Sequence, residues 1–273
     1  MPSQVDEVPK WLSFFRGAAE KLRESGYDFE SLTRGKAEIS LTGLMSHALM
    51  EVNKELHCYI EVPNPNANRK SNEFNSRSTD KLDYAKEEST GRKDLLILRK
   101  ENQDWENPEL YAEFKYYYNL DFEITGSNEF AFPGKNNISH IHENFGDLLK
   151  LYRFKLRHDK TTCVQGFYIC HNDKAKYAKI VGENHVHEFV TYYRNLHHNF
   201  SETKQRLKEH LASSIDTKKA DKSQRLLEEL EGLPNLGKSV HRFPTENMHV
   251  LPISDRNGFW LSLVLFEILS SKL

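Results

Sequence analysis

Residues 91–118 read GRKDLLILRKENQDWENPELYAEFKYYY, and this stretch predicts two neighbouring β-strands. The first, 94–99, is a compact apolar run, and the second, 110–118, alternates apolar residues with charged or aromatic ones. Short runs of this kind between polar residues are typical of strands. The connection 100–108 is long enough to join them as an antiparallel pair, so we expect the two strands to be adjacent in one sheet.

The second strand places an acid and a lysine on one side. Side chains alternate between the two faces of a strand, so Glu113 and Lys115 point to the same face. The opposite face carries the residues Leu110, Ala112, Phe114 and Tyr116. Asp94 opens the preceding strand, where a carboxylate can stand at the end of the sheet. Antiparallel pairing would therefore bring the carboxylates of Asp94 and Glu113 together.

This set of side chains suits a metal-dependent hydrolase. Two neighbouring carboxylates repel each other and raise a pKa unless a cation lies between them. Mg²⁺ prefers one or two carboxylates, keeps several waters and takes further oxygens from a substrate phosphate. We therefore expect Asp94 and Glu113 to be catalytic ligands of Mg²⁺, for which Mn²⁺ can substitute. Lys115 would be the catalytic residue that orients or deprotonates the metal-bound water, or binds the same phosphate.

The segment GRKD, followed by a predicted apolar strand, and AEFK on the next predicted strand resemble the PD-(D/E)xK nuclease superfamily, with Lys93 at the position of the proline. That superfamily includes type II restriction enzymes, Holliday-junction resolvases, lambda-type exonucleases and transposase-associated nucleases. The predicted order over 36–180, namely helix, three-stranded meander, helix and strand, is similar to its core. The resemblance implies an α/β fold with a restriction-endonuclease-like core, in which helices flank a mixed central sheet.

Helical additions are predicted at both ends of this core, from apolar residues spaced three and four apart. The predicted helices are 10–25, 41–56, 143–157, 185–213, 217–231 and 258–272. The other predicted segments are strands at 57–62 and 161–170, irregular stretches at 63–90 and 119–142, and an extended stretch near 239–253. We divide the chain into an N-terminal helical extension (1–35), the nuclease core (36–180) and a mostly helical C-terminal extension (181–273).

The resemblance also implies an acidic metal ligand on the first helix of the core. At 100° per residue, Glu55 falls inside the apolar stripe of the predicted helix 41–56, and Glu51 falls at its edge. An acid in an apolar stripe is costly unless it meets a cation or hydrogen bonds. We expect Glu51, which is nearer the middle of the helix, to be a catalytic metal ligand, with Glu55 as the alternative. The other interpretation is that Glu51 is solvated and Glu55 caps the helix end.

The predicted helix 143–157 carries basic residues beside its apolar face. The segment 150–179 contains eight Lys or Arg against two Asp, the strongest basic excess in the chain. Basic residues beside a phosphodiester-cleaving site would neutralise phosphate charge. We therefore expect Lys150, Arg153 and Arg157 to bind DNA, with Lys150 nearest the catalytic lysine. A solvated helix face is the alternative.

Composition limits the classes of protein that fit. Lys and Arg number 38 against 40 Asp and Glu, a net charge of −2, which excludes a uniformly basic coat and requires a local DNA-binding patch. The three cysteines show no CxxC pairing, so a reducing cytoplasm suits them better than a disulfide framework. The N-terminus lacks a signal-peptide pattern, and the most apolar run, 259–269, is too short to span a bilayer. We expect a soluble cytoplasmic protein that does not enter a membrane.

The function predicted from these features is divalent-metal-dependent endonuclease activity on DNA. GxGxxG, Walker A and GxSxG patterns are absent, which argues against a nucleotide-driven motor and a serine hydrolase. A type II restriction endonuclease, usually a homodimer, is the first candidate. The alternatives are a structure-specific, defence-associated or mobile-element-associated nuclease, an inactive nuclease-like DNA-binding or interaction module, and a chance pattern on an unrelated α/β domain. The segment 181–273 is left open between dimerisation, DNA reading and contact with a partner protein.

Overall fold

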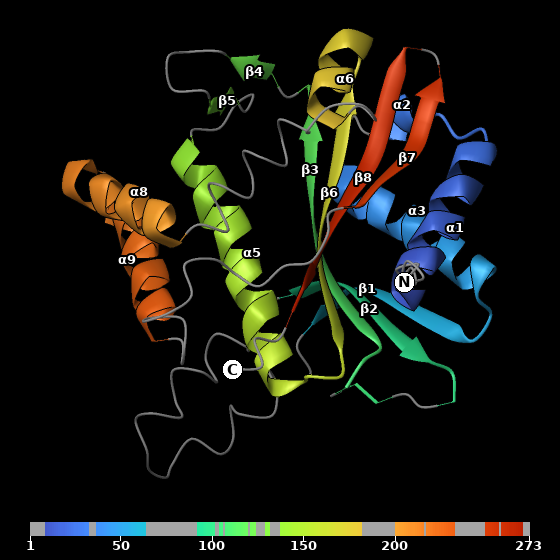
Figure 1. The fold of residues 1–273 in the computed structure, drawn as a ribbon, viewed down its shortest axis with the longest axis horizontal. Helices are drawn as coiled ribbons and strands as arrows, with labels where there is room; N and C mark the ends of the chain where they lie inside the picture. The colour runs from blue at the N-terminus through green and yellow to red at the C-terminus, as the bar shows by residue number, and fades with distance from the viewer. Residues whose placement is uncertain are drawn as a thin grey trace, which may run out of the picture.

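The structure confirms the predicted α/β class, with helices on both faces of a mixed six-stranded sheet (Figure 1). The computed structural model describes residues 9–32, 37–63, 92–101, 104–105, 107–119, 121–123, 129–131, 137–181, 200–215, 217–232, 249–256 and 258–269. Apart from its first residue, the predicted loop 63–90 lies outside these residues, as do much of 119–142 and most of 239–253. No helix in these ranges has the length and apolar composition that crossing a membrane requires.

The central sheet has the strand order β1-β2-β3-β6-β8-β7. Its strands are β1 Leu56–Pro63, β2 Arg92–Arg99, β3 Leu110–Tyr118, β6 Thr162–His171, β7 His249–Arg256 and β8 Phe259–Ile268. The pair β3–β6 is parallel, and the other neighbouring pairs are antiparallel. A separate small hairpin joins β4 Asp121–Glu123 to β5 Glu129–Ala131. The two strands predicted within 91–118 are therefore present, adjacent and antiparallel.

Helices cover both faces of the sheet (Figure 1). They are α1 Lys10–Glu24, α2 Phe29–Leu32, α3 Ala37–Val52, α5 Asn137–Arg157, α6 Lys174–Val181, α8 Phe200–Ser213 and α9 Thr217–Glu231. The helices α1 and α3 pack on one face, and α5 packs on the other. The pair α8–α9 lies on the outer side of α5, away from the sheet.

Strand β3 shows how the predicted alternation builds the two cores. Ala112 and Phe114 belong to the core under α1 and α3, whereas Tyr111 belongs to the core under α5. Strand β6, next to β3, is buried along nearly its whole length. At Gly166 of this strand an added Cβ would stand 2.4 Å from the Phe114 ring, so the two strands need glycine here.

The secondary structure of the C-terminal segment differs from the prediction. The predicted helix 258–272 is wrong, because Phe259–Ile268 forms β8, which lies between β6 and β7 in the sheet. A strand with both faces buried is a continuous apolar run, and such a run has no period that separates it from a buried helix. The segment 181–273, expected to be mostly helical, thus supplies two strands to the central sheet, and β7 overlaps the end of the predicted stretch 239–253.

Helix boundaries also differ from the prediction. Helix α3 begins at Ala37 and ends at Val52, four residues earlier at each end than the predicted helix 41–56. Helix α5 begins at Asn137, inside the stretch 119–142 that was expected to be irregular. The predicted helices 10–25 and 217–231 match α1 and α9 closely. Of the predicted helix 185–213, residues 200–213 form α8, and 185–199 lie outside the described ranges.

Candidate active site

The candidate site lies where β2 and β3 separate. These strands pair from Ile97↔Leu110 to Leu95↔Ala112, and the next opposed positions, Asp94 and Glu113, are not paired. The Asp94 Oδ2 atom accepts the backbone N–H of Phe114 at 2.8 Å, so a side chain replaces a ladder hydrogen bond there. Burial raises the pKa of Asp94, and the Phe114 N–H and Lys115 oppose that rise. Both predicted metal-binding acids thus stand at one end of the β2–β3 ladder.

Glu113 is a buried carboxylate, with 2% of its surface exposed. The Tyr111 hydroxyl donates a hydrogen bond to its Oε1 atom, and Lys150 Nζ from α5 forms an ion pair with the same atom. Burial raises the pKa of Glu113 well above its usual range, although Lys150 lowers it. Asp94 and Asp147 raise it further, which shows that the negative charges in this region act on one another.

Lys115 points to the same face as Glu113, as the strand alternation predicted. Its Nζ forms an ion pair with Asp147 of α5 at 2.7 Å and donates to the Phe114 carbonyl at 3.1 Å. Burial alone would lower the pKa of Lys115. Asp147 and Glu38 outweigh that effect and hold its pKa above the usual value. Lys115 is therefore kept as an ammonium, which favours binding or orienting an oxygen over taking its proton.

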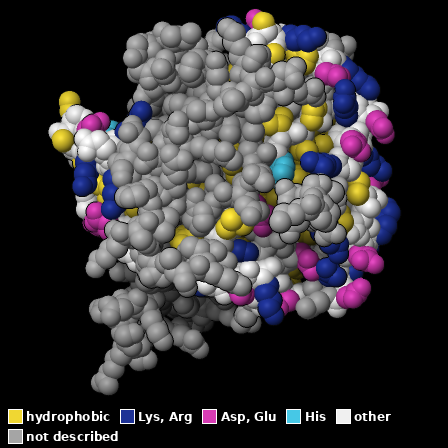
Figure 2. Space-filling model, in the orientation of Figure 1, with side chains coloured by type: hydrophobic (Ala, Val, Ile, Leu, Met, Phe, Trp, Pro, Cys, Tyr) yellow, Lys and Arg dark blue, Asp and Glu magenta, His cyan; other side chains and the backbone are white. Residues whose placement is uncertain are grey.

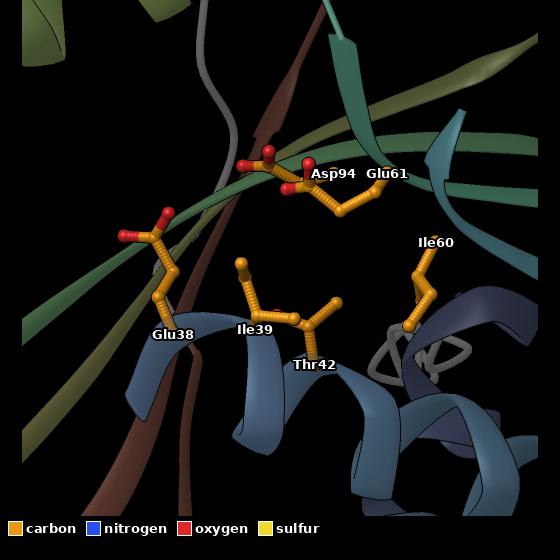
Figure 3. Close-up of a pocket in the computed structure, with 6 residues that line it drawn as sticks. All are labelled: Glu38, Ile39, Thr42, Ile60, Glu61 and Asp94. Carbon is orange, nitrogen blue, oxygen red and sulfur yellow. The ribbon is translucent and has the colours of Figure 1, made fainter. Parts of the chain in front are cut away.

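Glu38, in the first turn of α3, is the helix acid that faces this region. It lines a small pocket together with Ile39, Thr42, Ile60, Glu61 and Asp94. Figure 3 shows Glu38 extending from α3 toward the strands that carry Glu61 and Asp94. Burial raises the pKa of Glu38 to about 7; Lys115 lowers it, and Asp94 and Asp147 raise it.

The two helix acids predicted from the sequence lie elsewhere. Glu51, near the other end of α3, forms an ion pair with Lys21 of α1 at 2.8 Å. The hydrogen bond from Lys21 lowers the pKa of Glu51, opposite to the shift of Glu38. Glu55 is exposed in the turn that precedes β1. The structure therefore brings neither acid to Asp94 and Glu113, and it brings Glu38 instead.

A signal for Glu38 was present in the sequence. Glu38 precedes Leu41 by three residues and Met45 by seven, so it continues the apolar stripe of α3 by one turn. The predicted helix began at Leu41, and this boundary hid the acid. Helix starts are set by caps and tertiary packing, which the apolar period alone does not locate.

Glu61 is a further acid that the sequence did not indicate. It lies on β1 and lines the same pocket as Glu38 and Asp94. Its backbone has φ 51°, in the left-handed region that residues other than glycine adopt only occasionally. The amino-acid sequence of β1 does not predict this backbone conformation.

The basic residues predicted on α5 divide into two groups. Lys150 reaches the site, where it pairs with Glu113. Arg153 instead forms an ion pair with Glu229 of α9 at 3.3 Å. Arg157, on the exposed side of α5, donates a hydrogen bond to the Arg153 carbonyl oxygen at 3.3 Å. In the face shown in Figure 2, basic and acidic side chains are intermixed over the described surface. This mixture agrees with the expected absence of a uniform basic coat.

The charges of the site leave an excess of acid. Four carboxylates, those of Glu38, Asp94, Glu113 and Asp147, influence one another, and Lys115 and Lys150 are the two ammonium groups beside them. Full ionisation of these groups would place more negative than positive charge here, and a divalent cation would reduce that excess.

A cation at this site would be held by few protein ligands. Among the described residues, no group of three or more His, Cys, Asp and Glu is arranged to hold a metal. Mg²⁺ is usually bound through one or two carboxylates, with waters and substrate oxygens completing its shell. Asp94 and Glu113, each with one oxygen already bonded within the protein, suit that kind of site.

Comparisons of the chain with protein-family models, curated proteins and solved structures gave no match. The arrangement of Asp94, Glu113 and Lys115 is therefore interpreted through its own chemistry.

Proposed function

We propose that this chain is a divalent-metal-dependent nuclease that hydrolyses DNA phosphodiester bonds. The observation that carries the proposal is the meeting of Asp94 and Glu113 where β2 and β3 separate, with Lys115 on the same face as Glu113. In such a site the buried acids would bind a metal ion and the two lysines would bind the phosphate.

In the proposed mechanism, Asp94 and Glu113 hold Mg²⁺ or Mn²⁺. The bound ion would lower the pKa of a coordinated water and stabilise the charge that develops on the phosphate. Lys115, kept as an ammonium by Asp147 and Glu38, would orient the attacking water or bind a phosphate oxygen. Lys150, which forms an ion pair with Glu113, would contact the same phosphate group.

The arrangement of elements supports a restriction-endonuclease-like core. Helix α3 is followed by the meander β1–β2–β3, then by helix α5 and strand β6, which pairs with β3 in parallel. This order is the one that the resemblance implies for the superfamily core. Within that class we propose a type II restriction endonuclease first and a structure-specific or defence-associated nuclease second.

The decisive experiment is incubation of the purified protein with plasmid DNA and Mg²⁺ or Mn²⁺, with EDTA as the negative control. Discrete fragments would identify a restriction enzyme, whereas cleavage confined to branched DNA would favour a structure-specific nuclease. The variants Asp94→Ala and Lys115→Ala should each lose about 100- to 10,000-fold in rate. Glu51→Ala, an acid of α3 away from the site, is the matched control and should cut like the wild type.

Two results would contradict the proposal. One is undiminished cleavage by Asp94→Ala and Lys115→Ala, which would place the activity elsewhere. The other is a folded wild-type protein that cuts no supercoiled, linear, branched or single-stranded DNA with either metal, which would favour an inactive nuclease-like binding module.

A further inference from the structure

The two oxygens of the Glu113 carboxylate have different surroundings. Tyr111 lies two residues earlier on β3, and its hydroxyl donates to Oε1. The Lys150 ammonium contacts the same oxygen. Among the described residues, no side chain donates a hydrogen bond to Oε2. The protein therefore holds one oxygen of Glu113 and leaves the other for a ligand.

Asp94 shows the same division. Its Oδ2 atom accepts the Phe114 N–H at 2.8 Å, and within the described part of the chain no hydrogen bond reaches Oδ1. Each of the two carboxylates thus has one oxygen held by the protein. This arrangement suits binding of a cation through a single oxygen of each acid.

Tyr111 is held rigidly enough to direct Glu113. Its side chain is buried, with 1% exposed, and its ring makes an edge contact with Phe154 at 5.0 Å between centroids. The Lys93 ammonium lies 5.4 Å from the centre of the Tyr111 ring and 4.6 Å from that of Phe154. A buried ring fixed on several sides keeps its hydroxyl in one place.

We propose that Tyr111 is a positioning residue that turns Glu113 so that Oε2, together with Asp94 Oδ1, binds the divalent cation. This inference rests on the proposed function, because it assumes a cation at this site. Hydrogen bonds that orient a metal-binding side chain fix its angle and its basicity, and their loss weakens metal binding. Without the Tyr111 hydroxyl, Lys150 alone would hold Oε1, and the Glu113 carboxylate would be freer to rotate about its terminal bond.

The test compares Tyr111→Phe with Tyr117→Phe in the full-length protein. Tyr117 is a matched control because it lies on the same strand and face, is buried, and donates its hydroxyl to Asn144 Oδ1 at 2.8 Å, outside the proposed metal site. Mn²⁺ binding is measured by isothermal titration calorimetry, and DNA cleavage is measured over a range of Mn²⁺ concentrations. We expect Tyr111→Phe to bind Mn²⁺ roughly 10- to 100-fold more weakly and to regain much of its rate at high Mn²⁺. Tyr117→Phe should bind Mn²⁺ like the wild type.

The possible failures are distinguishable. If the wild type binds and uses Mn²⁺ and Tyr111→Phe does so equally well, the positioning role is overturned and the nuclease proposal stands. If the wild type neither binds Mn²⁺ nor cuts DNA, both proposals are overturned. Should Tyr111→Phe fail to fold, a wild-type crystal structure with Mn²⁺ decides: the ion on Oε2 and Oδ1 supports the inference, and the ion on Oε1 with Tyr111 displaced overturns it.

Discussion

Glu113 illustrates how individual side chains build a buried cluster of charges on a strand. Its position on β3 buries it, which is unfavourable for a charged group, and the Tyr111 hydroxyl and Lys150 ammonium compensate. Lys115 is stabilised in the same way by Asp147. The two acid–lysine pairs link β3 to α5 and concentrate charge in a mainly apolar interior.

The raised pKa of Glu38 should appear as a pH dependence of the unfolding free energy. Its pKa is about 7 in the folded protein against 4.5 for the ordinary group, so its stabilising contribution is complete below pH 4.5 and is lost as pH rises through 7. Glu38→Gln removes the titration. Without divalent cations, the unfolding free energy of the wild type should fall relative to Glu38→Gln by roughly 1–3 kcal/mol between pH 4.5 and 8, as measured by urea denaturation.

Glu51→Gln is the matched control for this pH series. Lys21 lowers the pKa of Glu51, so this acid stabilises the fold above its ordinary pKa and loses that contribution as the pH falls. The difference between wild type and Glu51→Gln should therefore change with pH in the opposite direction. The same trend in both variants would show that Glu38 is not the buried acid of the site.

At the scale of secondary-structure elements, the parallel contact between β3 and β6 packs against a residue next to the site. Phe114, whose N–H binds Asp94, packs directly against Gly166 of β6. The close approach of the two strands is therefore coupled to the position of an acid of the site.

The variant Gly166→Ala tests the close packing of β3 against β6. The added methyl group would overlap the Phe114 ring, so we expect a loss of about 1–3 kcal/mol in unfolding free energy. Gly146→Ala on α5 is the control, because its Cβ would be 3.9 Å from the nearest side-chain atom, Leu226 Cδ2. That change should be neutral or stabilise by about 0.5–1 kcal/mol through helix propensity. Equal stability of the two variants in thermal and urea unfolding would contradict the close packing of β3 on β6.

For the molecule as a whole, the sheet is completed by strands from the end of the chain. Strand β8 pairs with β6 along its length and carries β7 at its other side. Near the other end of the chain, Trp11 of α1 donates its indole N–H to Glu267 of β8 at 2.8 Å. Segments near the two ends of the sequence therefore contribute to one core.

A fragment of residues 1–181 tests this dependence. It contains every acid and lysine of the proposed site but lacks β8, so the buried residues of β6 such as Phe167 and Ile169 would lie at an open edge. We expect the fragment to show no cooperative thermal transition by circular dichroism, and co-expression with residues 182–273 to restore one. A cooperative transition of the fragment alone would show that β8 is dispensable.

Local periodicity was sufficient to predict β2, β3 and the shared face of Glu113 and Lys115, because the alternation of a strand depends only on neighbouring residues. The same reasoning predicted α1 and α9 from their apolar spacing. Three features required the folded chain: β8 as a strand, Glu38 as the helix acid, and the pairing of Asp147 and Lys150 with β3. Each depends on which distant segment packs against which; the apolar period of α3 extends to Glu38, but a period does not show which strands that end of the helix meets.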